Sequence, residues 1–84
     1  HVYNPDFWLP DHGFYIEAKG QFGQVDRMKM RLVKQYHPDE DIRMVFMRDN
    51  YIGKKSVTRT RYIEYAEKYG MKAGLLSDME GWLS

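Results

Sequence analysis

Two acids and a lysine near the start of the chain have the types and spacing of a phosphodiester-hydrolysing site. Asp6 follows Pro5, and further along the chain Glu17 and Lys19 lie on either side of Ala18. Hard divalent cations such as Mg²⁺ prefer oxygen ligands and are usually held by one or two carboxylates with water and phosphate. A metal ion held in this way can activate water and stabilise a transferring phosphate. These residues therefore indicate metal-dependent hydrolysis of phosphate esters.

The two acids come together if Asn4 to Lys19 folds as a β-hairpin. Pro10-Asp11-His12-Gly13 separates two runs of strand-forming residues and has the composition of a tight turn. A turn centred within it sets Asp6 opposite Glu17, and like charges directly across a strand pair destabilise a sheet. A bound cation is the simplest reason to keep them. One face of the hairpin is then apolar, with Pro5, Phe7, Leu9, Phe14, Ile16 and Ala18.

A helix is expected after the hairpin, from about Asp26 to Tyr36, ending before Pro38. Apolar residues recur at helical spacing, which predicts that they face the core; they are Val25, Met28, Leu32, Val33 and Tyr36. Arg27, Arg31 and Lys34 form a basic stripe on its outer side, which we interpret as a solvated face.

The remaining pattern predicts an α/β domain. Ile42 to Met47 reads as a third strand, and a strand–helix–strand order with short connections predicts that it lies parallel to the Glu17 strand. Thr58 is expected to cap a second helix reaching Tyr69, and Met71 to Leu76 a short extended piece. A capping box over Ser77 to Glu80 opens a last turn. We expect a mixed β-sheet of about three to four strands flanked by helices.

Charge distribution says more about partners than the net charge of +1 does. Cationic side chains are concentrated between Arg48 and Arg61, a segment in which Asp49 is the only acid. Phosphate contacts from Lys and Arg dominate DNA affinity, so the predicted DNA-binding residues are Lys54, Lys55, Arg59 and Arg61. The chain has no cysteine, which excludes disulfides and thiolate zinc sites within it. No apolar run approaches the ~20 residues of a membrane span.

Five motifs follow one another along nearly the whole chain. They are Tyr-x-Pro-Asp-Phe-x-Leu-Pro (Tyr3 to Pro10), Glu-x-Lys-Gly (Glu17 to Gly20), Gln-x-His-Pro (Gln35 to Pro38), Asp-Ile-Arg-x-Val-Phe (Asp41 to Phe46) and Glu-Lys-x-Gly (Glu67 to Gly70). In this order they resemble T-seven-type phage endonuclease I, a family of Holliday-junction resolvases with the PD-(D/E)xK nuclease core.

The resemblance implies a role for each residue of the predicted site. Asp6, Glu17 and Lys19 would be catalytic, with Asp6, Glu17 and the Ala18 carbonyl as ligands of one or two Mg²⁺ ions, for which Mn²⁺ would substitute. Lys19 would orient or activate the attacking water. The implied reaction is in-line hydrolysis of DNA phosphodiesters in four-way junctions and other branched DNA. The implied setting is the cytoplasm of a bacterial host, for a phage or prophage protein.

Family members also place a further catalytic Glu on a helix upstream of the first strand and form a domain-swapped homodimer. This chain opens with His1 inside a strand pattern, so we expect one PD-(D/E)xK restriction-endonuclease-like domain over residues 1–84 that lacks its N-terminal helix. Without that cover, self-association is expected through apolar residues among Phe7, Leu9, Phe14, Ile16, Met28, Met30, Met44 and Met47.

Two alternatives remain open at this point. The first is a PD-(D/E)xK nuclease that acts on nicked, mismatched or ordinary duplex DNA. The second is a DNA-binding or dimerising module in which catalysis is impaired. Metal-dependent cleavage separates the nucleases from the module, and competition between a four-way junction and a matched duplex separates the two nucleases.

Overall fold

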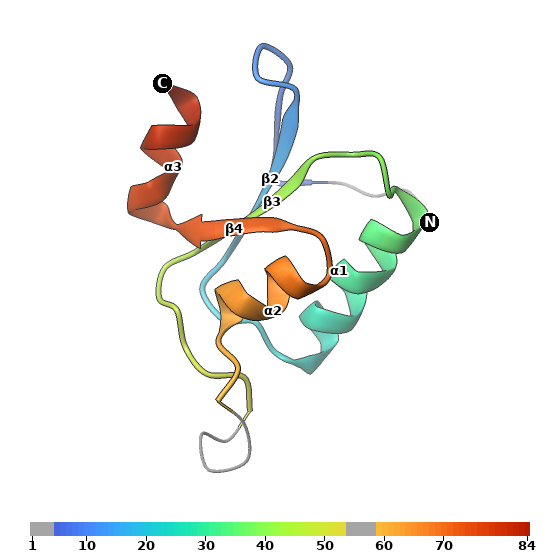
Figure 1. Cartoon of the computed structure of the whole chain (residues 1–84), viewed down its shortest axis with the longest axis vertical. Helices are drawn as coiled ribbons and strands as arrows, with labels where there is room; N and C mark the ends of the chain where they lie inside the picture. The colour runs from blue at the N-terminus through green and yellow to red at the C-terminus, as the bar shows by residue number, and fades with distance from the viewer. Residues whose placement is uncertain (1–4, 54–58) are drawn as a thin grey trace.

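The structure is a computed structural model that describes residues 5–53 and 59–84. Four strands and three helices follow one another along the described chain (Figure 1). In order, they are β1 (Phe7–Leu9), β2 (Phe14–Lys19), α1 (Gln24–Tyr36), β3 (Ile42–Phe46), α2 (Tyr62–Lys68), β4 (Lys72–Leu75) and α3 (Leu76–Leu83).

The four strands form one mixed sheet in the order β1-β2-β3-β4. β1 is antiparallel to β2, whereas β2, β3 and β4 run parallel to one another. The hairpin pairs Phe7 with Ile16 and Leu9 with Phe14, which confirms the predicted register. The predicted α/β class and the parallel pairing of β2 with β3 are confirmed as well.

Helices cover both faces of this sheet. On one face, Met30 of α1 and Ala66 of α2 pack against the β3 side chains in the larger hydrophobic core. On the other, Trp82 and Met79 of α3 pack against Phe14 and its neighbours Ile16 and Val45. Side chains alternate along a strand, so Glu17 and Lys19 belong to the face that carries α1 and α2.

Phe22 anchors the connection between β2 and α1. The sequence marks this Gly-rich segment only as a break, yet Phe22 is fully buried. Its ring lies 5.2 Å from that of Phe46 and 5.8 Å from those of Tyr62 and Tyr65. Aromatic burial of this kind stabilises a core strongly, and here it fixes the start of α1 against the sheet and α2.

The predicted core face of α1 is wrong. Met30 is fully buried and Val33 partly so, whereas four of the predicted residues are exposed, namely Val25, Met28, Leu32 and Tyr36. Two hydrogen bonds explain the rotation of the helix, because Arg27 Nη1 donates to the Phe22 carbonyl at 2.8 Å and Lys34 Nζ donates to the Glu40 carbonyl at 2.7 Å. The positions 27, 30 and 34 share one side of a helix, and that side faces inward.

The starts of the other two helices also differ from the prediction. α2 begins at Tyr62 rather than near Thr58, which lies outside the described residues. Asp49 Oδ1 accepts the Ile63 N–H at 3.0 Å and so serves the first turn of α2 from a distant loop. α3 begins at Leu76, where the Asp78 carboxylate accepts the Leu75 N–H at 2.8 Å, two residues ahead of the predicted capping box.

The expected exposure of apolar residues holds in part. Phe7, Met28 and Met47 are exposed. Four others are buried, because α3 covers the face of β2 and because α1 and β3 pack together; they are Phe14, Ile16, Met30 and Met44. No described helix has the length and apolar character needed to cross a membrane.

The orientation of α1 can be tested with two substitutions on the same helix. Met30→Ala should lower the free energy of unfolding by about 2–5 kcal/mol, because it leaves a cavity in the core. Leu32→Ala, at an exposed position, should change it by less than about 0.5 kcal/mol. Urea unfolding of both variants measures the difference, and the reverse order of the two losses would mean that α1 turns its predicted stripe inward.

Candidate active site

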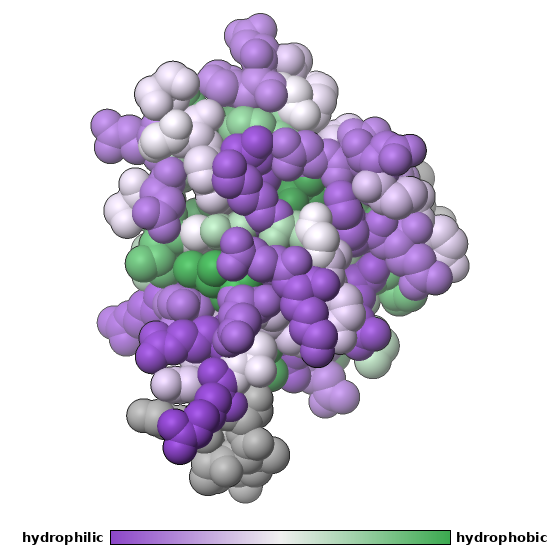
Figure 2. Space-filling model, viewed as in Figure 1, coloured by the Kyte–Doolittle hydropathy of each residue, from purple (hydrophilic) through white to green (hydrophobic). Residues whose placement is uncertain are grey.

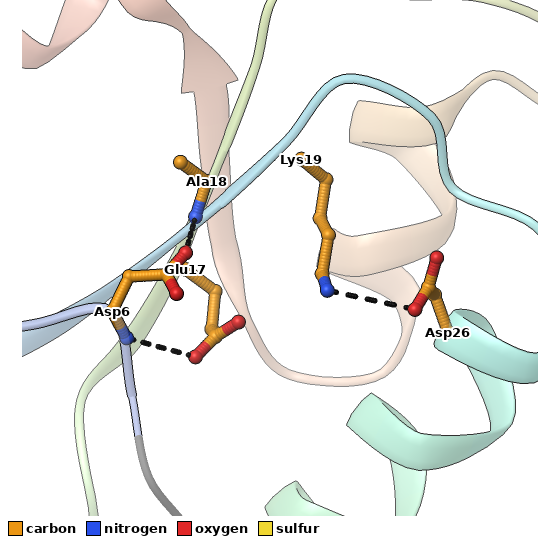
Figure 3. A network of polar contacts seen from close by, with 5 residues as sticks. All are labelled: Asp6, Glu17, Ala18, Lys19 and Asp26. Carbon is orange, nitrogen blue, oxygen red and sulfur yellow. Dashed lines mark hydrogen bonds and ion pairs between the residues drawn. The ribbon is translucent and has the colours of Figure 1, made fainter.

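Two hydrogen bonds join Asp6 to β2, one to Glu17 and one to Ala18 (Figure 3). The Asp6 N–H donates to Glu17 Oε1 at 3.1 Å, and the Ala18 N–H donates to Asp6 Oδ2 at 2.9 Å. The paired backbone of the hairpin ends at Phe7, so the Asp6 carboxylate takes the position that a strand carbonyl would occupy. The predicted opposition of the two acids is therefore built into the backbone. We call this pair of bonds the carboxylate clamp.

The two carboxylates of the clamp differ sharply in exposure. Glu17 is only 3% exposed and is the one buried charged residue in the described part of the chain. Asp6 is exposed, and its Oδ1 atom has no partner among the described residues. A buried carboxylate is unfavourable unless hydrogen bonds or a cation compensate its charge. The Asp6 N–H donates one such hydrogen bond to Glu17, and a cation entering from the Asp6 side would add opposite charge beside both carboxylates.

Ala18 adds a third oxygen to this corner. Its N–H points to Asp6, and the N–H and C=O of one strand residue point to the same side of the strand. The Ala18 carbonyl therefore lies on the Asp6 side of β2, as a backbone ligand would need. The atoms at this corner that could bind a metal are all oxygens, and Mg²⁺ prefers oxygen ligands.

Lys19 lies on the same face of β2 as Glu17, and in Figure 3 both side chains extend from β2 in the same general direction. Its ammonium group contacts Asp26 of α1, with 3.5 Å between Nζ and Oδ1, rather than either acid of the clamp. Both side chains are partly exposed, and such ion pairs contribute about 0–1 kcal/mol. Lys19 is thus held near the clamp by a bond weak enough to be exchanged for a phosphate.

Asp26 is the residue of this site that the sequence did not reveal. Its position suggested only an acid in the first turn of a helix. The available signal was the short Gly-rich connection, since it returns the chain from β2 to the start of α1 within a few residues. Within residues 5–53 and 59–84, no group of three or more His, Cys, Asp or Glu side chains is placed to hold a metal ion. Asp6 and Glu17 are the two carboxylates that could hold a metal, and Asp26 stands apart beside Lys19.

The structure separates the four predicted DNA-binding residues. Lys54 and Lys55 lie outside the described residues, and Arg59 is an exposed cation. Arg61 is held by its own chain, because its guanidinium donates to the Tyr51 hydroxyl at 3.2 Å and to the Asp49 carbonyl at 3.4 Å. The hydrogen bond that Arg61 donates to the Tyr51 hydroxyl raises the pKa of Arg61 above its usual value. Arg61 thus closes the loop before α2 while remaining charged.

Comparison with known proteins gives consistent matches. The family model for phage endonuclease I matches residues 1–79. Endonuclease I of Escherichia phage T7 is 42% identical over 72 residues, which cover 86% of this chain and 47% of that protein. Endodeoxyribonuclease 1 of Enterobacteria phage T3 is 42% identical over 71 residues, which cover 84% and 45%. The chain thus spans about half the length of these curated relatives.

The contribution of the carboxylate clamp to stability can be tested in the absence of metal. Asp6→Ala removes the acceptor of the Ala18 N–H and should lower the free energy of unfolding by about 1 kcal/mol. Asp6→Asn keeps an acceptor oxygen and relieves the repulsion between the carboxylates, so stability should hold or rise. Urea unfolding in a chelator measures both variants. Equal losses would show that the bond to Ala18 is not the reason for the effect.

Proposed function

Because this chain belongs to the phage endonuclease I family, we propose that it carries the catalytic core of a metal-dependent DNA endonuclease. The observation that supports this most directly is the carboxylate clamp, which holds Asp6 and Glu17 beside Lys19. The proposed substrates are four-way junctions and other branched DNA. The proposed setting is the cytoplasm of a bacterial host.

The residues of the clamp suit one or two Mg²⁺ ions, with Mn²⁺ as a substitute. Asp6, Glu17 and the Ala18 carbonyl would hold the metal, since all three offer oxygen to the same corner. When bound, such an ion supplies charge for the phosphate and lowers the pKa of water. The hydrogen bonds of the clamp fix both carboxylates before any ion enters, so little reorganisation is needed.

Lys19 would act on the phosphate side of the reaction. Its ammonium group leaves Asp26 and donates to a phosphate oxygen or to the attacking water, because the present ion pair is weak and partly exposed. Charge that develops on the phosphate during in-line attack would be stabilised by this ammonium group. Asp26 is a positioning residue in this scheme, since it contacts Lys19 rather than the substrate.

A preference for branched DNA requires two active sites at a fixed separation. We propose that the chain works as a homodimer, with domain swapping in the longer protein. Exposed apolar side chains outside the core support association, among them Phe7, Trp8, Val25 and Tyr36. A nuclease for nicked, mismatched or ordinary duplex DNA is the alternative, and equal cleavage of a junction and a matched duplex would favour it.

Metal binding can be measured without cleavage. Mg²⁺ at ten times its Kd should stabilise the chain by about 1.4 kcal/mol through binding to the folded state alone. Glu17→Gln should abolish this rise in thermal stability, whereas Asp11→Asn, at an exposed turn position, should keep it. Thermal unfolding with and without Mg²⁺ gives the result. An equal rise in Glu17→Gln would place the metal elsewhere.

Cleavage tests the catalytic roles directly. Asp6→Asn, Glu17→Gln and Lys19→Ala should each reduce junction cleavage by at least about 100-fold, because each removes charge stabilisation in the transition state. Binding of the junction in a chelator should change little. Asp26→Asn should keep more activity than Lys19→Ala, since it acts through Lys19.

Cleavage is measured with a four-way junction and a matched duplex in competition. An active Glu17→Gln variant would refute the site. A chain that binds junctions but cuts no DNA with Mg²⁺ or Mn²⁺ would favour the impaired binding module.

A further inference from the structure

Two arginines of α1 lie over two tyrosine rings of α2 and its C-terminal end. The Arg27 guanidinium lies over the Tyr65 ring at 5.8 Å, and the Arg31 guanidinium lies over the Tyr69 ring at 4.4 Å. Arg31 lies four residues after Arg27, and Tyr69 lies four residues after Tyr65. The two helices therefore run in the same direction. The pairs form two rungs one helical turn apart, which is about 6 Å along the axis.

Two further cations flank these rungs. Lys68 lies 5.7 Å from the Tyr69 ring on the α2 side, and Lys34 on the α1 side reaches the Glu40 carbonyl. A shallow open hollow of about 230 Å³ lies at the upper rung, lined by Arg31, Lys34, Gln35 and Tyr69. We call this surface the arginine–tyrosine furrow, formed by Arg27, Arg31, Lys34, Tyr65, Lys68 and Tyr69. In Figure 2, strongly hydrophilic side chains cover the region over α1 and α2.

The acids near the furrow are few and directed elsewhere. Asp26 pairs with Lys19, and Glu64 caps the start of α2 by accepting the Arg61 N–H at 3.4 Å. Glu67 precedes Lys68 by one position, which turns it about 100° away around the helix. The furrow therefore presents an excess of positive charge.

Arg31 is the residue best placed to bind a ligand. Arg27 is anchored by its bond to the Phe22 carbonyl, but Arg31 makes no hydrogen bond or ion pair with any residue in the described part of the chain. Arg31 Cζ lies 4.4 Å from the Tyr69 ring centroid, and a guanidinium over an aromatic ring can still donate from its N–H groups. A guanidinium edge matches two oxygens of a phosphate.

We infer that the arginine–tyrosine furrow binds the phosphate backbone of DNA, as a contact separate from the active site. The inference rests on the proposed function in taking DNA as the ligand. Base stacking on Tyr69 is not expected there, because the Arg31 guanidinium already lies over that ring. The spacing of the rungs corresponds to about two nucleotides at 3.4 Å of axial rise per nucleotide.

The furrow and the active site meet different flanks of α1. Asp26 contacts Lys19 of the active site, while Arg27, the next residue, contacts Tyr65 of α2. Successive residues of a helix point about 100° apart, so the two surfaces lie on different flanks of α1. The furrow would then add affinity without touching the reacting phosphate.

The test is a salt titration of DNA binding in a chelator, where no cleavage is needed. Arg31→Ala with Lys68→Ala should remove two phosphate contacts and flatten the slope of log affinity against log salt by about 1.8. Between about 50 and 200 mM salt, the wild type should therefore lose about 12-fold more affinity than the double variant. The matched control is Lys72→Ala, which removes an exposed cation near an aromatic ring on the opposite face and should leave the slope unchanged.

Two further variants separate binding from packing. Arg31→Lys keeps the positive charge but loses the planar guanidinium. If the furrow binds phosphate through charge, this variant should keep the wild-type slope of log affinity against log salt. The Arg31→Ala and Lys68→Ala variant should remain folded at the assay temperature in a thermal unfolding experiment, so that a change of slope reports lost phosphate contacts. A flattened slope that thermal unfolding traces to loss of the folded state would overturn the inference.

The outcomes for the furrow and for the nuclease are distinct. An unchanged slope in the folded double variant overturns the furrow, even if the wild type cleaves junctions. A flattened slope supports the furrow, even if the wild type cuts no DNA and the proposed nuclease fails. A wild-type chain that binds neither duplex nor junction overturns both.

Discussion

The carboxylate clamp is the interaction on which the candidate site depends. Two backbone N–H groups, those of Asp6 and Ala18, each donate to the carboxylate of the opposing segment. The acids are therefore positioned by the backbone at the end of a hairpin and not by free rotation of their side chains. Such an arrangement concentrates negative charge beside a nearly buried Glu17, which is unfavourable by itself. Its use is that a divalent cation would find its ligands already in place, so that little ordering entropy is lost on binding.

Helix α1 links this site to the rest of the molecule through its rotation. Phe22 and Arg27 fix the start of the helix, and Met30 fills the core above β3. The same rotation directs Asp26 towards Lys19 and Arg31 towards Tyr69. The rotation of α1 about its axis thus determines both the partner of Lys19 in the active site and the arginine–tyrosine pairs of the furrow. A loss of core packing at α1 would be felt at both surfaces, although neither contains Met30.

The parts of the fold that the sequence predicted are those governed by local rules. The hairpin register follows from turn chemistry and strict alternation, and it places Phe7 opposite Ile16 as expected. The face of α1 was not predictable from periodicity, because Val25, Met28, Leu32 and Tyr36 form a better apolar stripe than the residues that are buried. The start of α2 depends on Asp49, fourteen residues before its partner Ile63, and no local capping pattern reports such a contact. The pairing of Lys19 with Asp26 was missed for the same reason, since it depends on how α1 packs on the sheet.

The two halves of the candidate site differ in rigidity, and that difference has a chemical sense. The acids are held by backbone hydrogen bonds within β2 and its neighbour, which are among the more persistent contacts of a sheet. Lys19 is held by one partly exposed ion pair, which water and salt weaken. Metal ligands gain from fixed geometry, because an ion tolerates little displacement of its oxygens. A group that follows a phosphate from bound substrate to transition state gains from a long side chain that can move, provided that its resting position is near. Asp26 supplies that resting position, so the ion pair with Lys19 places a mobile cation beside a fixed pair of acids.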